Sequence, residues 1–443
     1  MRLSRRTLLA GTAAALCLAA SPAQADEAAE TADGGAILRR WYRLVLRLVR
    51  HTPTYSPPVA SRSFGYLGVA AYQAVASGPA ALLSLEGQLN GLAGLPARQQ
   101  GQAYSDALIA HCVMALAVKS FFGNTGPTGQ RVMAATEKKL KAEALAGVPD
   151  EVARRSIAYA EALMAAILDW SETDGGARIE NMGFPMDYKL TVGPSNWVPT
   201  SAIRQQQVPL LPSWGNNRTF AMPDGAACPL PPPPAYSEEP SSAFYREALE
   251  VYQTVKSLTP EQEAIARFWS DDPMLSPTPP GHWIFIANDI LEQQQASLDR
   301  TAEVMMRLGV AMADAFIGCW NAKFQYDLLR PVTYIKRVID PKWETLLITP
   351  PFPEYPSGHS TQSGAAAAVL TSLFGDNFAF TDRTHERDGL APRSFPSFEA
   401  AAQEAGISRL YGGIHYRVAI VQGIAQGKCI GQHAVALRTR SST

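Results

Sequence analysis

The sequence predicts an all-α protein for two reasons. Apolar residues recur at helical spacing along most of the 443 residues, and strand-like alternation is scarce. Residues 37–50 show the pattern clearly, with Ile37, Trp41 and Leu44 on one face. Further helices are expected at residues 63–76, 104–121, 129–146, 150–170, 243–256, 260–269, 283–295, 301–327, 361–374, 398–408 and 416–436.

The opposite face of the helix at 37–50 carries a stripe of basic residues. They are Arg40, Arg43, Arg47 and Arg50. Such a stripe is typical of a solvated outer face, and a membrane-surface role is the alternative.

The segment 174–242 differs from the rest because it is rich in proline, glycine and asparagine and contains Pro231-Pro232-Pro233-Pro234. It also carries Trp197, Trp214 and Phe220, which could anchor it. We expect a long ordered excursion that wraps the helices, with a disordered linker as the alternative.

The N-terminus has the features of an export signal. Ser4-Arg5-Arg6-Thr7-Leu8-Leu9 is a twin-arginine pattern, an apolar run follows at 8–20, and Ala23-Gln24-Ala25 is a small-residue cleavage site. We therefore expect a signal peptide at 1–25 and a periplasmic or secreted protein. The apolar run is too short to span a bilayer stably and no later stretch qualifies, so no membrane span is expected. The net charge of −1 gives no indication of a nucleic-acid partner.

The mature chain would keep four cysteines, which are Cys112, Cys228, Cys319 and Cys429. They are far apart and form no CxxC pair, which argues against a zinc or iron–sulfur site. Export permits disulfides, and the three possible pairings stay open. Cys319 is expected to be buried and free.

Three short motifs in the C-terminal third carry the chemistry. They are Lys323-x6-Arg330-Pro331, then Pro356-Ser357-Gly358-His359, and then Ser408-Arg409-x5-His415. Together they supply three cations, two histidines and a Ser-Gly turn that opens a helix. Arginine presents a planar fork of donors to the oxygens of a tetrahedral centre, and lysine adds a compact charge.

The spacing of these residues suggests how they meet. Lys323 and Arg330 are seven apart, which predicts that they lie on nearly the same side of one helix that Pro331 ends or kinks. Free N–H groups after Ser357 would favour an anion at a helix N-terminus, and Gly358 would let the backbone approach it closely. Three clustered cations repel one another, so the sequence predicts a site for a multiply charged oxyanion.

The three motifs in this order resemble the superfamily that joins type-2 acid phosphatases (PAP2) to vanadium-dependent haloperoxidases. The resemblance covers roughly residues 35–437 and is specific only in the C-terminal third. It implies two four-helix-bundle-like halves with the oxyanion site at one end of the C-terminal bundle. The expected parts are a signal peptide at 1–25, an N-terminal bundle at 26–173, the wrapping loop at 174–242, and a catalytic bundle at 243–443.

In the haloperoxidase branch, the resemblance implies that vanadate is the cofactor, in a site that phosphate can also occupy. His415 would be the metal ligand, His359 would bond the axial oxygen, and Lys323 would polarise hydrogen peroxide, so that these three residues are the catalytic group. A halide would be oxidised to hypohalous acid or an equivalent, with a small organic acceptor as a further candidate partner. The oxyanion would be held by Lys323, Arg330, Ser357, the amide of Gly358, and Arg409.

In the phosphatase branch, the same residues would act differently. His415 would attack phosphorus to form a phosphohistidine, and His359 would protonate the leaving group.

Residues around the motifs favour the haloperoxidase branch. Pro350-Pro351-Phe352-Pro353-Glu354-Tyr355 is similar to the haloperoxidase form of the second motif. Phe352 and Trp320 match positions that line the halide pocket in that family, although aromatic residues commonly serve in core packing. The stretches 268–273 and 279–283 resemble bacterial haloperoxidases. Asp272 is expected to pair with Arg409, and Asp271 is the alternative.

One position departs from the family pattern. The third motif usually has an aspartate four residues after its histidine, and here that position is Ala419. His415 would then need a backbone carbonyl or another side chain to fix its tautomer. The departure weakens the phosphatase reading more than the haloperoxidase one. It also motivates a third hypothesis, a non-catalytic oxyanion binder. Five further histidines are expected to be structural or solvated, with His282 able to approach the site: His51, His111, His282, His385 and His433.

Overall fold

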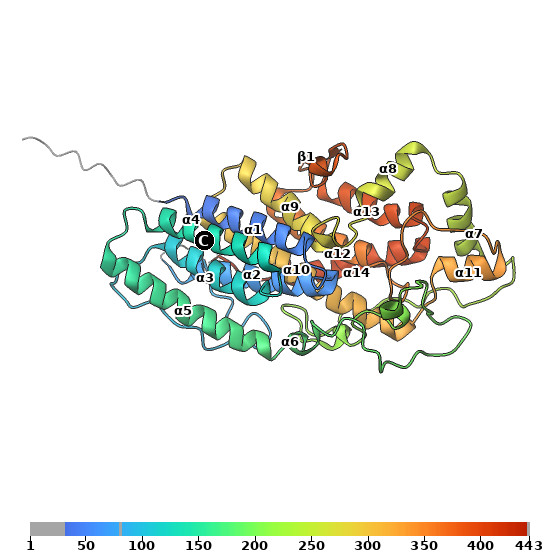
Figure 1. Cartoon of the computed structure of the whole chain (residues 1–443), viewed down its shortest axis with the longest axis horizontal. Helices are drawn as coiled ribbons and strands as arrows, with labels where there is room; N and C mark the ends of the chain where they lie inside the picture. The colour runs from blue at the N-terminus through green and yellow to red at the C-terminus, as the bar shows by residue number, and fades with distance from the viewer. Residues whose placement is uncertain (1–31, 79–81, 441–443) are drawn as a thin grey trace, which may run out of the picture. The chain divides into compact units, whose positions relative to one another are not determined.

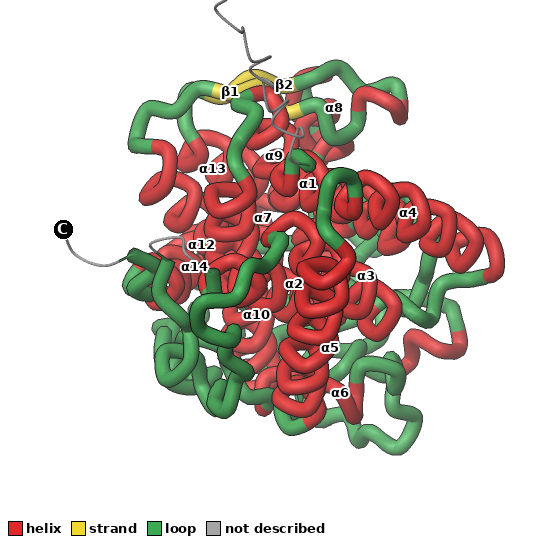
Figure 2. The backbone as a smooth tube through the Cα atoms, turned by 90° about the vertical axis from the view of Figure 1, so that its left-hand side faces the viewer, coloured by secondary structure: helices red, strands yellow, loops and turns green. Residues whose placement is uncertain are grey.

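The structure is a computed structural model that describes residues 32–78 and 82–440, so the expected signal peptide at 1–25 lies outside the described residues. The described part is almost entirely helical, which confirms the all-α prediction (Figures 1 and 2). Its helices are α1 Gly34–Arg50, α2 Pro57–Ala76, α3 Asp106–Phe121, α4 Pro127–Leu145, α5 Asp150–Glu172, α6 Gly176–Ile179, α7 Ala243–Lys256, α8 Pro260–Phe268, α9 Thr278–Gln293, α10 Leu298–Tyr326, α11 Pro331–Val338, α12 Gly358–Phe374, α13 Phe398–Tyr411 and α14 Arg417–Val435.

Helix α10 connects the two groups of helices that the sequence predicts. It packs along α2 on one side and along α12 and α14 on the other (Figure 1). The contact with α2 is close because glycine faces backbone: a Cβ at Gly309 would lie 2.5 Å from the Phe64 carbonyl oxygen. The described residues from Ala32 onward form one compact unit, and the boundaries expected at 173 and 242 stay a prediction.

The basic stripe of α1 is used within the protein. Arg40 pairs with Glu143, Arg43 with Glu292, and Arg50 with Asp388. Because these partners come from other parts of the fold, the stripe serves to fasten α1 to its neighbours. No helix in the described part of the chain combines the length and apolar character that crossing a bilayer requires.

The segment 174–242 is an ordered excursion, as expected from its aromatic residues. Trp197, Trp214 and Phe220 are all buried, and short 3-10 helices form at Arg204–Gln207 and Trp214–Asn216. The excursion passes close to the second motif, since the Leu210 amide donates to the Pro351 carbonyl at 3.0 Å. Its far end is joined to α14 by a disulfide between Cys228 and Cys429.

Two local features were not expected from the sequence. A helical turn α11 follows Pro331, and two short antiparallel strands, β1 Phe380–Asp382 and β2 Arg393–Phe395, pair at the edge of the helices (Figure 2). A third short 3-10 helix, Glu386–Asp388, lies between the strands. Cys112 and Cys319 are free, and Cys319 is buried as expected.

Candidate active site

The residues of the three motifs lie together where the ends of α10, α12, α13 and α14 meet. Lys323 lies in the last turn of α10, Ser357 caps the start of α12, and Arg409 lies in the last turn of α13. His415 lies two residues before the first residue of α14. Because the packed helices bring these ends together, residues separated by more than 90 positions in sequence form one cluster.

The prediction that Lys323 and Arg330 share one helix face is wrong. Asp327 takes a left-handed conformation with φ 45° and ψ 43°, which ends α10. Arg330 is extended, with φ −75° and ψ 153°, and Pro331 begins the new helix α11. A residue before proline avoids the helical region, and proline fits the first helical position, so the chain turns between the two cations.

Ser357 and Gly358 build the helix N-terminus that the sequence predicts. The Ser357 hydroxyl oxygen accepts from the Ser360 amide at 3.3 Å, and the Ser357 amide donates to the Ala419 carbonyl at 3.1 Å. A Cβ at Gly358 would meet nothing nearer than Trp320, at 3.9 Å. Space therefore remains beside the Gly358 backbone, next to the positive end of the helix dipole.

Arg330 and Arg409 are held by backbone carbonyls. Arg330 Nε donates to Phe352 O at 2.9 Å, and Nη1 donates to Ile414 O at 2.9 Å and to His415 Nε2 at 3.1 Å. Arg409 Nη2 donates to Trp269 O, and its Nε donates to Ser408 Oγ at 3.0 Å. These bonds fix both guanidinium groups within the protein without using all of their donors.

Lys323 is fixed more completely. Its ammonium group donates to the carbonyls of Pro353 at 2.8 Å, Glu354 at 3.0 Å, and Pro356. These three bonds occupy the three N–H donors of the lysine, so in this structure it contributes its charge. A direct bond from Lys323 to an oxyanion stays a prediction.

Burial makes the cationic cluster electrostatically unfavourable. It lowers the pKa of Lys323 to about 7 and the pKa values of Arg330 and Arg409 to about 10. Burial also lowers the pKa of His415 well below its usual range, and Arg330 and Lys323 lower it further. An anion among these groups would offset their desolvation and mutual repulsion.

The donor set fits an oxyanion. Arg330 Nη2 and His359 Nε2 are buried atoms with no hydrogen-bond partner among the described residues. Burial and Arg409 lower the pKa of His359 well below its usual range, and Asp271 acts in the opposite direction. Gly358 and His359 are themselves half-buried, so the cluster is open on their side. Unused donors, open backbone at Gly358 and three buried cations are what a tetrahedral oxyanion such as vanadate or phosphate requires.

Trp320 and Phe352 lie beside the cations. Their ring centroids are 4.9 Å apart, and Phe352 lies 5.2 Å from Lys323 Nζ and 5.0 Å from the Arg330 guanidinium carbon. Trp320 Nε1 donates to Leu210 O at 3.2 Å, so the excursion holds its ring. The two aromatics form an apolar wall next to the cluster, and their role in halide binding stays a prediction.

The expected ion pair between Arg409 and Asp272 is wrong as a direct contact. Within the described residues, the Arg409 guanidinium donates to Ser408 Oγ and to the carbonyls of Ala266 and Trp269 and not to a carboxylate, although both Asp271 and Asp272 raise its pKa. The reason is local geometry: Trp269 presents its carbonyl to Arg409, and Asp271 takes a positive φ of 50° that directs it to histidines.

A buried network of histidines and carboxylates lies behind His359. Asp271 bonds His282 Nδ1 at 3.0 Å and His385 Nε2 at 3.3 Å, and its Oδ2 is 3.9 Å from His359 Nε2. Asp382 bonds His282 Nε2 at 2.7 Å. Burial alone would lower the pKa of His282, but the two carboxylates outweigh it and raise that pKa to about 10.

The histidine network was largely missed by the sequence interpretation, which held that His282 alone could approach the site. Its members come from the α8–α9 connection, α9, the last residue of β1 and the loop after β1. Ligand atoms of Asp271, His282 and His385 lie within 4.8 Å of one another, but a metal ion there would have to replace the hydrogen bonds already made.

Glu354 is a further residue at the site that the sequence interpretation missed. Its Oε1 lies 2.8 Å from His415 Nδ1, and the residue is fully buried. The alanine at position 419 predicted that another group must support His415, but it did not indicate that this group is Glu354. A charged residue within the otherwise apolar run Pro350–Tyr355 was the available signal.

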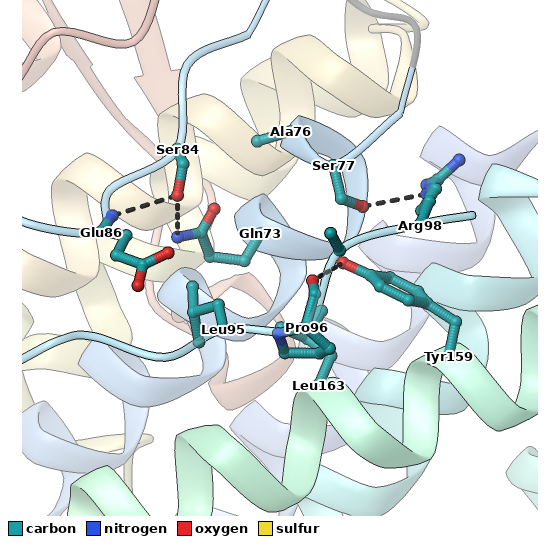
Figure 3. A pocket seen from close by; sticks show the side chains of 11 residues that line it. Gln73, Ala76, Ser77, Ser84, Glu86, Leu95, Pro96, Arg98, Tyr159 and Leu163 are labelled. Carbon is teal, nitrogen blue, oxygen red and sulfur yellow. Dashed lines mark hydrogen bonds between the residues drawn. The ribbon is translucent and has the colours of Figure 1, made fainter. Parts of the chain in front are cut away.

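A cavity of about 300 Å³ lies elsewhere, between α2, α5 and the segment after residue 82. Figure 3 shows that its polar side chains bond one another or nearby backbone: Ser84 accepts from Gln73, Ser77 from Arg98, and the Tyr159 hydroxyl bonds the Pro96 carbonyl. None of its lining residues belongs to the three motifs.

The fold and the cluster together define a helical protein with a buried, cation-lined oxyanion site at the meeting point of helix ends. A family model described as the VCPO second helical-bundle domain matches residues 303–442. The chain is 37% identical to a structure described as the first bacterial vanadium-dependent iodoperoxidase, over 92% of this chain and 97% of that one, with a TM-score of 0.83. The chain therefore belongs to the vanadium-dependent haloperoxidase family.

Two curated relatives match over shorter segments. The vanadium-dependent bromoperoxidase of Ascophyllum nodosum is 32% identical over 136 residues, which are 25% of this chain and 24% of that protein. The vanadium chloroperoxidase of Curvularia inaequalis is 27% identical over 193 residues, which are 36% and 32% of the two chains. The matched segments thus span about a quarter and a third of these relatives.

Proposed function

We propose that this protein is a vanadate-dependent peroxidase that oxidises a halide with hydrogen peroxide to hypohalous acid or an equivalent. The observation that carries the proposal is the buried cluster of Lys323, Arg330 and Arg409 around His415, with unpartnered donors on Arg330 and an unpartnered nitrogen on His359. Family membership and the names of the relatives support the choice of vanadate over other oxyanions.

Each residue of the cluster would have a separate role. His415 Nε2 accepts from Arg330 Nη1 at 3.1 Å, and vanadate would replace that hydrogen bond, which makes Nε2 the candidate vanadium ligand. Arg330, Arg409, Ser357 and the Gly358 amide would hold the oxygens and balance their charge. Bound vanadate would supply a Lewis-acidic centre that activates hydrogen peroxide towards attack by halide.

His359 and the aromatic wall would complete the site. His359 Nε2 has no hydrogen-bond partner among the described residues, so it is available to exchange a proton with peroxide or with a product. Phe352 and Trp320 would limit water beside the reacting atoms, which strengthens the electrostatic interactions there. This arrangement supports the proposed pocket for halide.

Two alternatives carry less support. A phosphatase could use the same cations, but the similar structure over nearly the whole chain is an iodoperoxidase. A non-catalytic binder was motivated by Ala419, and that motivation is weakened because Glu354 bonds the His415 nitrogen that an aspartate at 419 was expected to support.

Removing and restoring vanadate tests the proposal. Purified protein stripped of metal should not brominate or iodinate an organic acceptor with hydrogen peroxide, and adding orthovanadate should restore halogenation. Hydrolysis of an aryl phosphate would be followed in parallel. Phosphate release that vanadate suppresses, without halogenation, would show a phosphatase instead.

We also propose that the protein is exported through its twin-arginine signal. The disulfide between Cys228 and Cys429 supports export, because such bonds persist in oxidising compartments. The expected mature protein begins after Ala25, as intact-mass spectrometry of periplasmic or secreted material would show, and changing both Arg5 and Arg6 to lysine should retain it in the cytoplasm. Uncleaved protein found only in the cytoplasm would refute this proposal.

A further inference from the structure

We infer that Glu354 is a positioning residue that fixes the tautomer and orientation of His415, in place of the carboxylate that is absent at position 419. The inference rests on the proposed function in one respect, which is that His415 Nε2 faces the oxyanion. The tautomer itself can be measured without vanadate or turnover.

The geometry at Nδ1 shows the direction of the hydrogen bond. Glu354 Oε1 lies 2.8 Å from His415 Nδ1 and accepts from the Tyr416 amide at 2.9 Å. Burial raises the pKa of Glu354 to about 8, and Arg330 and Lys323 act to lower it. As a carboxylate, Glu354 can only accept, so Nδ1 then carries the proton and donates it to Glu354.

The geometry at Nε2 leads to the same tautomer independently. Arg330 Nη1 lies 3.1 Å from Nε2, and an arginine can only donate. Nε2 must then be the unprotonated nitrogen, with its lone pair turned towards the cations. The two contacts are compatible with one neutral tautomer only, which has its proton on Nδ1.

The backbone of Glu354 is fixed, so its carboxylate can orient a neighbour. Its amide donates to the Leu328 carbonyl at 2.9 Å and its carbonyl accepts from Lys323 at 3.0 Å. The next residue, Tyr355, donates from its hydroxyl to the Pro231 carbonyl at 2.7 Å. A side chain on so constrained a segment loses little further freedom when it bonds His415.

Position 419 explains why the carboxylate comes from this segment. Ala419 lies in the first turn of α14 and is fully buried, and its carbonyl is taken by the Ser357 amide at 3.1 Å. Its methyl group cannot accept a hydrogen bond from His415. Glu354 lies in the segment before α12 and bonds His415 from there. The carboxylate therefore comes from the second motif and not from the third.

Glu247 provides a matched control. Its carboxylate accepts from the Val418 amide at 3.0 Å, so it also holds the start of α14, but it makes no hydrogen bond to His415. A change at Glu247 loosens the helix end without touching the imidazole. The comparison separates support of His415 from general stability of this region.

The test is long-range ¹H–¹⁵N NMR of the histidine rings in vanadate-free protein labelled with ¹⁵N-histidine, with the His415 signal assigned by its loss in His415→Gln. Wild type and Glu354→Gln should show His415 neutral with its proton on Nδ1, because a glutamine oxygen can still accept. Glu354→Met leaves Nδ1 without its acceptor, so the fraction of His415 with its proton on Nε2 should rise, although Arg330 still favours a proton on Nδ1. Equilibrium dialysis with orthovanadate, and separately with inorganic phosphate, should show affinity falling roughly 10–100-fold in Glu354→Met.

Glu247→Met should leave both the tautomer and the affinities as in wild type. The inference is overturned if wild-type His415 carries its proton on Nε2, or if a folded Glu354→Met keeps its affinities for vanadate and phosphate within twofold of wild type. If Glu354→Met does not fold, a wild-type His415 with its proton on Nε2 would still refute the inference. A protein that shows the expected tautomer but never halogenates would refute the proposed function and leave this inference standing.

Discussion

Replacing His415 with alanine is expected to abolish vanadate-dependent halogenation, with turnover falling by roughly 10²–10³-fold or more. The change removes Nε2, the imidazole lone pair that Arg330 now contacts at 3.1 Å, and leaves the three cations in place. Vanadate should still be attracted by charge but bind more weakly, as equilibrium dialysis would show. Halogenation with stepwise addition of orthovanadate is the measurement.

The control for this change is His433→Ala, in the last turn of α14, which is the helix that follows His415. It removes an imidazole from the same region of sequence but from the opposite end of that helix, and it should keep full activity. If His415→Ala halogenates at the wild-type rate when saturated with vanadate, His415 is not the metal ligand.

Replacing Gly427 with alanine is expected to destabilise the fold by about 3 kcal/mol and to disturb the site. Gly427 lies where α14 crosses α12, and a Cβ there would lie 1.9 Å from the Thr361 carbonyl oxygen and 2.8 Å from the Ala365 amide nitrogen. These are backbone atoms, so α12 itself must move. Since α12 begins at Gly358, the movement would reach the oxyanion site, and both the thermal midpoint and vanadate affinity should fall.

Gly126→Ala is the matched control because the same methyl group is added where nothing lies within 4 Å and φ is −67°. It should lower the thermal midpoint much less than Gly427→Ala, because its cost is limited to the weaker preference for alanine at the N-cap of α4. An unchanged midpoint for Gly427→Ala would mean that α12 and α14 are not packed this closely.

Much of the fold could be predicted from sequence, because helical periodicity indicates the long helices. The order of the three motifs predicts that Lys323, Arg330, Ser357, Arg409 and His415 form one site, and their role there stays a prediction. The structure brings these five residues together at helix ends. Such predictions succeed because helical periodicity and short motifs depend on residues that are close together in the sequence.

The two wrong predictions were drawn from local sequence patterns, and both concern contacts that depend on how the chain folds. Lys323 and Arg330 have helical spacing, yet Asp327 in a left-handed conformation ends α10 between them. Asp272 was expected to pair with Arg409, but the Arg409 guanidinium donates to the Trp269 carbonyl instead. Spacing reports which residues could meet, but competing donors and acceptors decide which of them bond.

The sequence by itself determined the helical class, the ordered excursion with its aromatic anchors, and a cluster of cations fit for a multiply charged oxyanion. Only the tertiary structure decided which side chain supports His415. Glu354 is 61 residues away in sequence, and it acts because the α10–α11 connection and the excursion hold its backbone against the start of α14. The physical reason is that a buried imidazole needs an acceptor in one particular place, and any part of a folded chain can provide it.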